Sequence, residues 1–166
     1  MAAANYNLLF DGEDDYIEIS DDADFSVATT GQLSVSAWIR ADVLTFPVFQ
    51  STGYVHWIGK GEAGQHEWVF RMYNEHTTDI PPRPNRISFY VFNPAGGEGI
   101  GSYFQEPVQA GEWIHVVGMA DEEKTSIFKN GEFKNAIVTP GPVQALATII
   151  RPTCGSHLCT GLRRCG

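Results

Sequence analysis

Most of the first 150 residues alternate between apolar and polar positions in short runs. Residues 32–41 alternate two sets of side chains, one of Leu33, Val35, Ala37 and Ile39 and the other of Ser34, Ser36, Trp38 and Arg40. A period of two residues is typical of a β-strand with one face in the core. Residues 54–61, 66–74, 86–93 and 112–121 follow the same pattern and are rich in aromatic and β-branched residues, which favour strands. The chain is therefore predicted to be all-β.

Turn residues separate these runs. Asn130-Gly131 lies between two alternating runs within residues 125–138, which is the strongest short-range signal of a hairpin. Residues 77–86 are too rich in proline for a central strand and residues 93–101 are rich in glycine, so both are predicted loops. No segment has a helical period with caps. This punctuation predicts ten or more short strands in a two-sheet antiparallel β-sandwich, or jelly roll.

The run 112–121 is apolar on both of its faces. Ile114, Val116, Gly118 and Ala120 share one face, and Trp113, His115, Val117 and Met119 share the other. This pattern predicts a central strand of its sheet.

The length of 166 residues suits one domain, which we place at residues 1–150. The last part, residues 151–166, contains Cys154, Cys159 and Cys165, three arginines and no acid. It has a poor strand pattern, and we expect a tail that is non-native or disordered. An odd number of cysteines confined to this tail cannot form a disulfide framework for the domain.

The formal net charge is −9, which repels nucleic acids and anionic lipids. Neither a basic stripe nor an apolar run long enough to cross a bilayer is present. We therefore expect no nucleic-acid partner and no membrane insertion. Such a surface is compatible with cations or with neutral partners such as sugars.

Three segments resemble the successive motifs of laminin G-like, concanavalin A-like jelly-roll domains. They are LLFDGEDDYIEI (residues 8–19), QLSVSAWIRA (residues 32–41) and GEWIHVVGMADEEKTSIFKNGEF (residues 111–133). The resemblance covers roughly residues 6–137, in the order and spacing of the family. It implies two antiparallel sheets, a carbohydrate site at the rim of the concave sheet, in many members a structural calcium, and mostly non-catalytic roles. It also implies an extracellular or surface-associated location, although the chain shows no signal peptide.

The acidic turn after the first predicted strand has two interpretations. Asp11, Asp14 and Asp15 fall within five residues, and calcium needs six to eight oxygen ligands. The alternative is an ordinary turn in which an Asp side chain bonds the nearby backbone. If calcium binds, Asp11 and Asp14 are the first ligands and Asp15 the next. The second acidic cluster, Asp21, Asp22 and Asp24, is predicted to be a solvated loop.

The sequence departs from the family at its end. The family closes with a strand that pairs beside the first strand, and residues 154–166 match nothing in that pattern. Without the closing strand, the first strand is an exposed edge, which favours a homo-oligomer.

Aromatic and planar polar side chains in the middle of the chain are candidates for a sugar site. Sugars bind by stacking on aromatic faces and by bonding a few polar groups. Glu67, Arg71 and Tyr73 are predicted to share the polar face of their strand, while Trp68, Phe70 and Met72 share the core face with His66. The full candidate set is Tyr54, His56, Glu67, Arg71, Tyr73, Tyr90, Asn93 and Tyr103.

These observations predict a non-catalytic module that binds a carbohydrate or a glycoprotein, for example in adhesion. The alternative is a structural or assembly protein, such as a virion-surface or filament component, that uses the sandwich as a contact surface. Jelly-roll β-glucanases use acids alternating on one strand, and residues 14–18 supply only part of that pattern. We therefore predict that the chain is not an enzyme.

Overall fold

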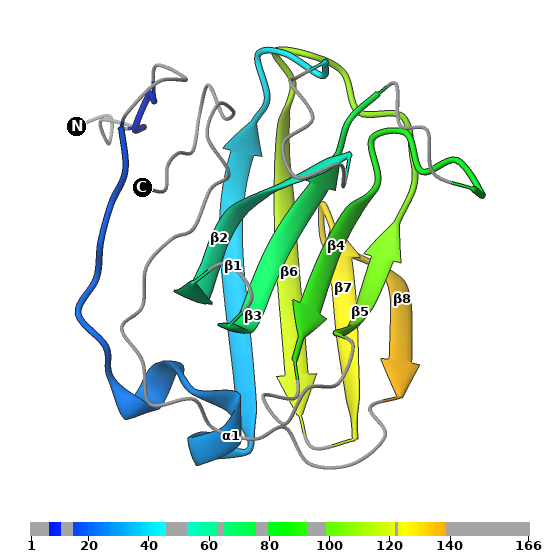
Figure 1. Ribbon diagram of the computed structural model, residues 1–166. Helices are drawn as coiled ribbons and strands as arrows, with labels where there is room; N and C mark the ends of the chain where they lie inside the picture. The colour runs from blue at the N-terminus through cyan, green and yellow to red at the C-terminus, as the bar shows by residue number, and fades with distance from the viewer. Residues whose placement is uncertain are drawn as a thin grey trace, which may run out of the picture.

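The computed structural model describes residues 7–10, 15–45, 53–62, 65–75, 80–92, 99–121 and 123–138. These residues form two four-stranded antiparallel sheets packed face to face (Figure 1), which confirms the predicted all-β sandwich. The strands are β1 (Gln32–Arg40), β2 (Tyr54–Glu62), β3 (Gln65–Tyr73), β4 (Ile87–Val91), β5 (Ile100–Phe104), β6 (Trp113–Asp121), β7 (Lys124–Lys129) and β8 (Glu132–Val138).

The first sheet has the order β1-β6-β7-β8. As predicted, β6 is a central strand, with β1 on one side and β7 on the other. The predicted hairpin joins β7 to β8, and its turn residues Asn130 and Gly131 have φ angles of 51° and 83°. Asn and Gly tolerate this left-handed conformation better than other residues, which explains why this pair marks the turn.

The second sheet has the order β2-β3-β4-β5 and lies in front of the first in Figure 1. Its strand β5 begins at Ile100, inside the glycine-rich segment predicted to be a loop. The pairing of β2 with β3 shifts register twice, between His56 and Ile58 and again between Lys60 and Gly61. Each shift adds one residue to one strand, so the alternation of side chains changes phase there.

The core lies between the two sheets. The second sheet contributes Trp57, Trp68, Phe70 and Phe89, among others, to this core. Gly118 of β6 faces these rings, and a Cβ at this position would lie 2.5 Å from Phe89 and 2.6 Å from Phe70. Glycine therefore lets two phenylalanines approach the backbone of the opposite sheet closely. Ile114, Val116, Gly118 and Ala120 of β6 are buried, so this face of the strand is the one that points into the core.

Two regions before β1 differ from the prediction. Residues 8–10 and 15–20 were expected to belong to the first two strands, yet no strand forms there among the described residues. Within the described part of the chain β1 pairs only with β6, and residues 8–10 and 15–20 pair with no described strand. Leu9 is 66% exposed and Ile19 53% exposed, in keeping with an unpaired segment.

Short helices occupy residues that were predicted to be a solvated loop or left without an element. A 3₁₀-helix spans Ala23–Phe25 and the helix α1 spans Val27–Thr30. Asp22 caps the 3₁₀-helix by accepting a hydrogen bond of 2.9 Å from the backbone N–H of Asp24. Both elements are too short to leave a helical period in the sequence.

Candidate functional site

Four side chains form one row across the outer face of the second sheet. His56 lies opposite Arg71, Arg71 opposite Ser88, and Ser88 opposite Tyr103 in the strand register. Residues directly opposite each other in antiparallel strands point to the same side of the sheet. The neighbouring residues Phe70 and Phe89 are in the core, so this row faces away from it.

Arg71 of β3 lies at the centre of this face, packed among aromatic rings. Its guanidinium carbon is 4.4 Å from the ring centre of Tyr54, 4.3 Å from that of Tyr90 and 5.2 Å from that of Phe92. Its Nε donates a hydrogen bond of 3.0 Å to Nε2 of His56. Each stacked ring contributes about 0.5–1 kcal/mol, so the contacts together restrict the position of the guanidinium group.

Two further arginines flank the same set of tyrosines. Arg83 donates a hydrogen bond of 2.8 Å from Nη1 to the hydroxyl of Tyr73. Arg86 stacks on Tyr103 with its guanidinium carbon 4.0 Å from the ring centre, and two of its nitrogens bond Oε1 of Gln105 at 3.1 and 2.8 Å. These contacts extend the surface from β3 to β5.

We call this surface the arginine–aromatic face. It consists of Tyr54, His56, His66, Arg71, Tyr73, Tyr90, Phe92 and Tyr103, with Arg83 and Arg86 beside it. Most of these side chains are half-buried, while His66 and Tyr73 are buried.

The two histidines of this face are held neutral. Burial, followed by the charges of His66 and Arg71, lowers the pKa of His56 to about 2. Burial and Arg71 lower the pKa of His66 to about 4, against a smaller opposing effect of a hydrogen bond with the backbone of Gly61. Since Nε2 of His56 accepts from Arg71, the neutral ring carries its proton on Nδ1. The positive charge of this group therefore belongs to Arg71.

Several neighbouring groups also affect the pKa of Tyr90. Burial raises the pKa of its hydroxyl most strongly and Tyr73 raises it further, while Arg71, Arg83 and Arg86 act in the opposite direction. All three arginine charges therefore act on this hydroxyl. The face is a region of positive charge on a protein whose net charge is −9.

The structure places Glu67 elsewhere than expected. Glu67 was predicted to share a face with Arg71 and Tyr73. It is instead the extra residue of β3 at the second register shift, where it has no partner on β2. Its side chain is fully buried, bonds the hydroxyl of Ser26 at 2.7 Å and lies 3.2 Å from Nζ of Lys60. Lys60 in turn lies 3.1 Å from Asp21. Glu67 therefore binds the segment before β1 to the second sheet instead of facing a ligand.

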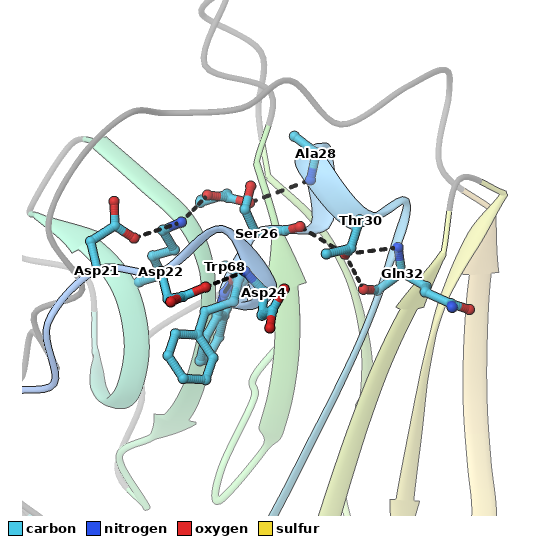
Figure 2. Close-up of polar contacts among 11 residues, drawn as sticks. Asp21, Asp22, Asp24, Ser26, Ala28, Thr30, Gln32 and Trp68 are labelled. Atoms are coloured by element: carbon cyan, nitrogen blue, oxygen red, sulfur yellow. Dashed lines mark hydrogen bonds and ion pairs between the residues drawn. The ribbon is translucent and has the colours of Figure 1, made fainter.

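Figure 2 shows this polar network around residues 21–32. Trp68, the neighbour of Glu67, donates a hydrogen bond of 2.9 Å from its indole nitrogen to the carbonyl of Phe25. Asp21 and Asp22, which were predicted to be solvated, thus have structural partners. Asp21 pairs with Lys60 and Asp22 caps the 3₁₀-helix.

Two members of the face, His66 and Phe92, were not in the predicted ligand set. His66 was predicted to share the core face of β3, but its ring centre lies 4.5 Å from that of His56 and 5.9 Å from that of Phe92. The register shift at Lys60 and Gly61 reverses the phase of the strand there. The only sequence signal is the glycine at position 61, where φ is 104°.

The other predicted ligand residues divide into two groups. Tyr54, His56, Arg71, Tyr73, Tyr90 and Tyr103 come together on the arginine–aromatic face. Asn93 lies outside the described residues, as do Asp11, Asp14 and the tail of residues 151–166. Asp15 is described and exposed. Within the described ranges, no cluster of three or more His, Cys, Asp or Glu side chains could hold a metal ion.

The outer face of the first sheet has a different character. Trp38, Trp113, Met119 and Phe133 are exposed there, and Trp38 reaches 63%. His115 lies beside Trp38 with ring centres 5.0 Å apart, and its Nε2 is 2.8 Å from the hydroxyl of Ser36. We call this surface the open apolar face. No helix in the described part of the chain has the length and apolarity that crossing a membrane requires.

Two four-stranded antiparallel sheets packed face to face define a β-sandwich. A family model described as "Concanavalin A-like lectin/glucanases superfamily", within the laminin G group, matches residues 11–151. The chain therefore belongs to this superfamily as a laminin G-like domain. No curated protein matches its sequence.

The solved structures to which this chain is similar include the following two, both at low sequence identity. The sialidase module CBM40 of Ruminococcus gnavus, bound to α2,3-sialyllactose, has 12% identity and a TM-score of 0.54, covering 93% of this chain and 87% of the module. The galectin LEC-6 of Caenorhabditis elegans has 12% identity and a TM-score of 0.47, covering 85% of each chain. The first of these supports the same fold for this chain.

Proposed function

We propose that this domain is a non-catalytic module that binds carbohydrate or glycoprotein through the arginine–aromatic face. The observation that carries the proposal is the packing of Arg71 among Tyr54, Tyr90 and Phe92 with its Nε bonded to His56. Aromatic rings offer stacking surfaces for the C–H faces of a sugar, and a positioned guanidinium offers hydrogen-bond donors for its oxygens. We expect the module to work at a surface or outside the cell.

The preformed geometry favours binding. The side chains that would meet a sugar are already held by contacts with each other, so little side-chain entropy is lost when a ligand arrives. Tyr103 is fixed by Arg86, and Tyr73 by Arg83. The superfamily also contains glucanases, so fold membership alone does not exclude hydrolysis. Glu67 accepts a hydrogen bond from Ser26 and forms an ion pair with Lys60, so its carboxylate does not lie on this face as a candidate catalytic acid.

A glycan array tests the proposal. We expect the domain to bind a limited set of glycans, and we expect Tyr90→Ala to weaken that binding because it removes a ring that packs against Arg71. Trp38→Ala serves as the control, since Trp38 is an exposed aromatic residue on the opposite outer face. Failure to bind any glycan on a broad array, by a protein with the circular dichroism of a folded β-sandwich, would reject the proposal.

Assembly is a second candidate function, and the open apolar face favours it. Trp38 and Phe133 are 63% and 60% exposed, which is unusual for side chains of this size on a lone domain. In this candidate a second copy of the chain covers that face in a homo-oligomer. Light scattering over a range of concentrations would detect the oligomer, and a monomer at every concentration would exclude it.

Calcium at the acidic turn remains part of the proposal. Asp11, Asp14 and Asp15 would be the ligands, and the ion would stabilise the native state by binding to it. A ligand that binds only the native state raises its thermal midpoint, so calcium at millimolar concentration should raise that midpoint, and Asp14→Asn should reduce the effect. An unchanged midpoint would remove calcium from the account.

A further inference from the structure

We infer that the arginine–aromatic face selects saccharides that carry a carboxylate, with Arg71 as the residue that recognises it. This inference rests on the proposed function, because it names the ligand class of the same site. The argument starts from the position of the guanidinium group and then considers the charges around it.

Arg71 is positioned by contacts that leave its charge uncompensated within the described residues. Its described partners are three aromatic rings and a neutral imidazole. None of the ion pairs among the described residues includes Arg71 or Arg86. Glu67, Glu106 and Asp21 form their ion pairs with lysines, and Asp42 forms its ion pair with Arg40.

The neighbouring groups strengthen the positive potential of the face. Arg83 donates a hydrogen bond to Tyr73 and Arg86 stacks on Tyr103, and both of these tyrosines belong to the arginine–aromatic face. Burial and Arg71 keep both histidines neutral, so the positive charge of the face comes from its arginines. The rest of the chain is acidic overall, so this concentration of arginines is a local exception.

A carboxylate is the group that fits this arrangement. The Nε of Arg71 is occupied by His56, which leaves the two Nη atoms as the remaining donors of the planar fork. Two parallel N–H donors match the two oxygens of a carboxylate, and such charge-assisted bonds are about twice as strong as neutral ones. The stacked tyrosines would then hold the sugar ring next to its acidic group.

Matched pairs of sugars test the inference by isothermal titration calorimetry. One pair is 3′-sialyllactose and its methyl ester, and the other is trigalacturonate and its methyl ester, so the two arms distinguish a sialic acid from a uronic acid. We expect at least one acidic sugar to bind about tenfold more tightly than its neutral partner, the size of one charge-assisted interaction. We also expect this preference to fall as salt is added.

Two variants locate the preference. Arg71→Met removes the charge and keeps an apolar side chain between the tyrosines, so the ratio of acidic to neutral affinity should fall close to one. Arg71→Lys keeps the charge and loses the fork, so it should restore only part of the ratio. Arg40→Met is the matched control, because Arg40 also lies over an aromatic ring, that of Trp113, but on the open apolar face. It should leave the ratio unchanged.

The outcomes separate the inference from the proposed function. Equal affinity for acidic and neutral sugars, or a preference that persists in folded Arg71→Met, would overturn the inference and leave carbohydrate binding in place. A preference for a sulfated glycan over both carboxylated sugars would also overturn it. If no glycan binds, both the inference and the proposed function fall. If Arg71→Met does not fold, the salt dependence of the wild-type preference and Arg71→Lys still decide the matter.

Discussion

The two outer faces of this sandwich differ in how their aromatic residues are used. On the arginine–aromatic face the rings pack against arginines and histidines, and most are half-buried or buried. On the open apolar face Trp38 and Phe133 extend into solvent. Both faces come from strands with the same alternating pattern. The difference teaches that the same alternating pattern can produce a surface on which aromatic rings are held by polar groups or one on which they extend into solvent.

The largest expected effect concerns the buried network that supports the arginine–aromatic face. Glu67→Ala would leave Lys60 buried with only the partly exposed Asp21 as its partner. Removing one member of a buried ion pair is strongly destabilising, and we expect a loss of about 3 kcal/mol in the free energy of unfolding. Urea denaturation followed by tryptophan fluorescence measures it.

The first sheet supplies a contrasting variant for the same measurement. Thr125 of β7 is fully buried, and its hydroxyl has no hydrogen-bond partner among the described residues. Replacing it by valine removes an unsatisfied polar group of similar shape, so the stability should change little or rise. Equal losses for Glu67→Ala and Thr125→Val would contradict this contrast between the two sheets.

A second prediction concerns pH. The pKa of each site histidine is about 6.5 in the unfolded chain and lower in the folded one, at about 2 for His56 and about 4 for His66. Below pH 6.5 the unfolded state therefore binds more protons, and the stability falls as the pH falls. We expect a loss of about 1 kcal/mol per pH unit for each histidine between pH 6.5 and pH 5.

The double variant His56→Gln, His66→Gln isolates this effect. A glutamine at position 56 retains an acceptor for Arg71, and neither glutamine titrates. The window above pH 5 avoids most of the titration of carboxylates, whose pKa values in the unfolded chain lie near 4. The urea midpoint of the variant should depend less on pH than that of the wild type. Identical slopes would show that these histidines do not hold low pKa values.

The pattern of the sequence predicted much of the fold and part of the site, and the register shifts explain most of the remainder. Strict alternation identified β1 and β6, and Asn130-Gly131 identified the β7–β8 hairpin. His66 and Glu67 were assigned to the wrong surroundings because an extra residue in β3 reverses the alternation, which no periodicity reveals in advance.

Short elements were the other source of error. Strand β5 has five residues and begins within a glycine-rich segment, and α1 has four residues, so neither produces a recognisable period. Residues 15–20 have a strand-like pattern, but a strand also needs a neighbour with free backbone groups. Pairing depends on distant parts of the chain, which local pattern does not encode.

The smallest expected effect on stability belongs to the open apolar face. Trp38 is mostly exposed, so Trp38→Ser should change the free energy of unfolding by about 0.5 kcal/mol or less. The same change should weaken any self-association, because it removes the most exposed tryptophan of that face. Size-exclusion chromatography with light scattering measures this. An oligomer of undiminished stability in the variant would show that another surface, such as a strand edge, forms the contact.

The comparison is tested most directly by mapping a bound glycan with two-dimensional NMR. The wild-type protein, labelled with ¹⁵N, would be titrated with the glycan that binds best on the array. The account predicts that the amide signals of Tyr54, Arg71 and Tyr90 shift, while those of Trp38, Trp113 and Phe133 stay in place. Shifts confined to the strands of the open apolar face would contradict it.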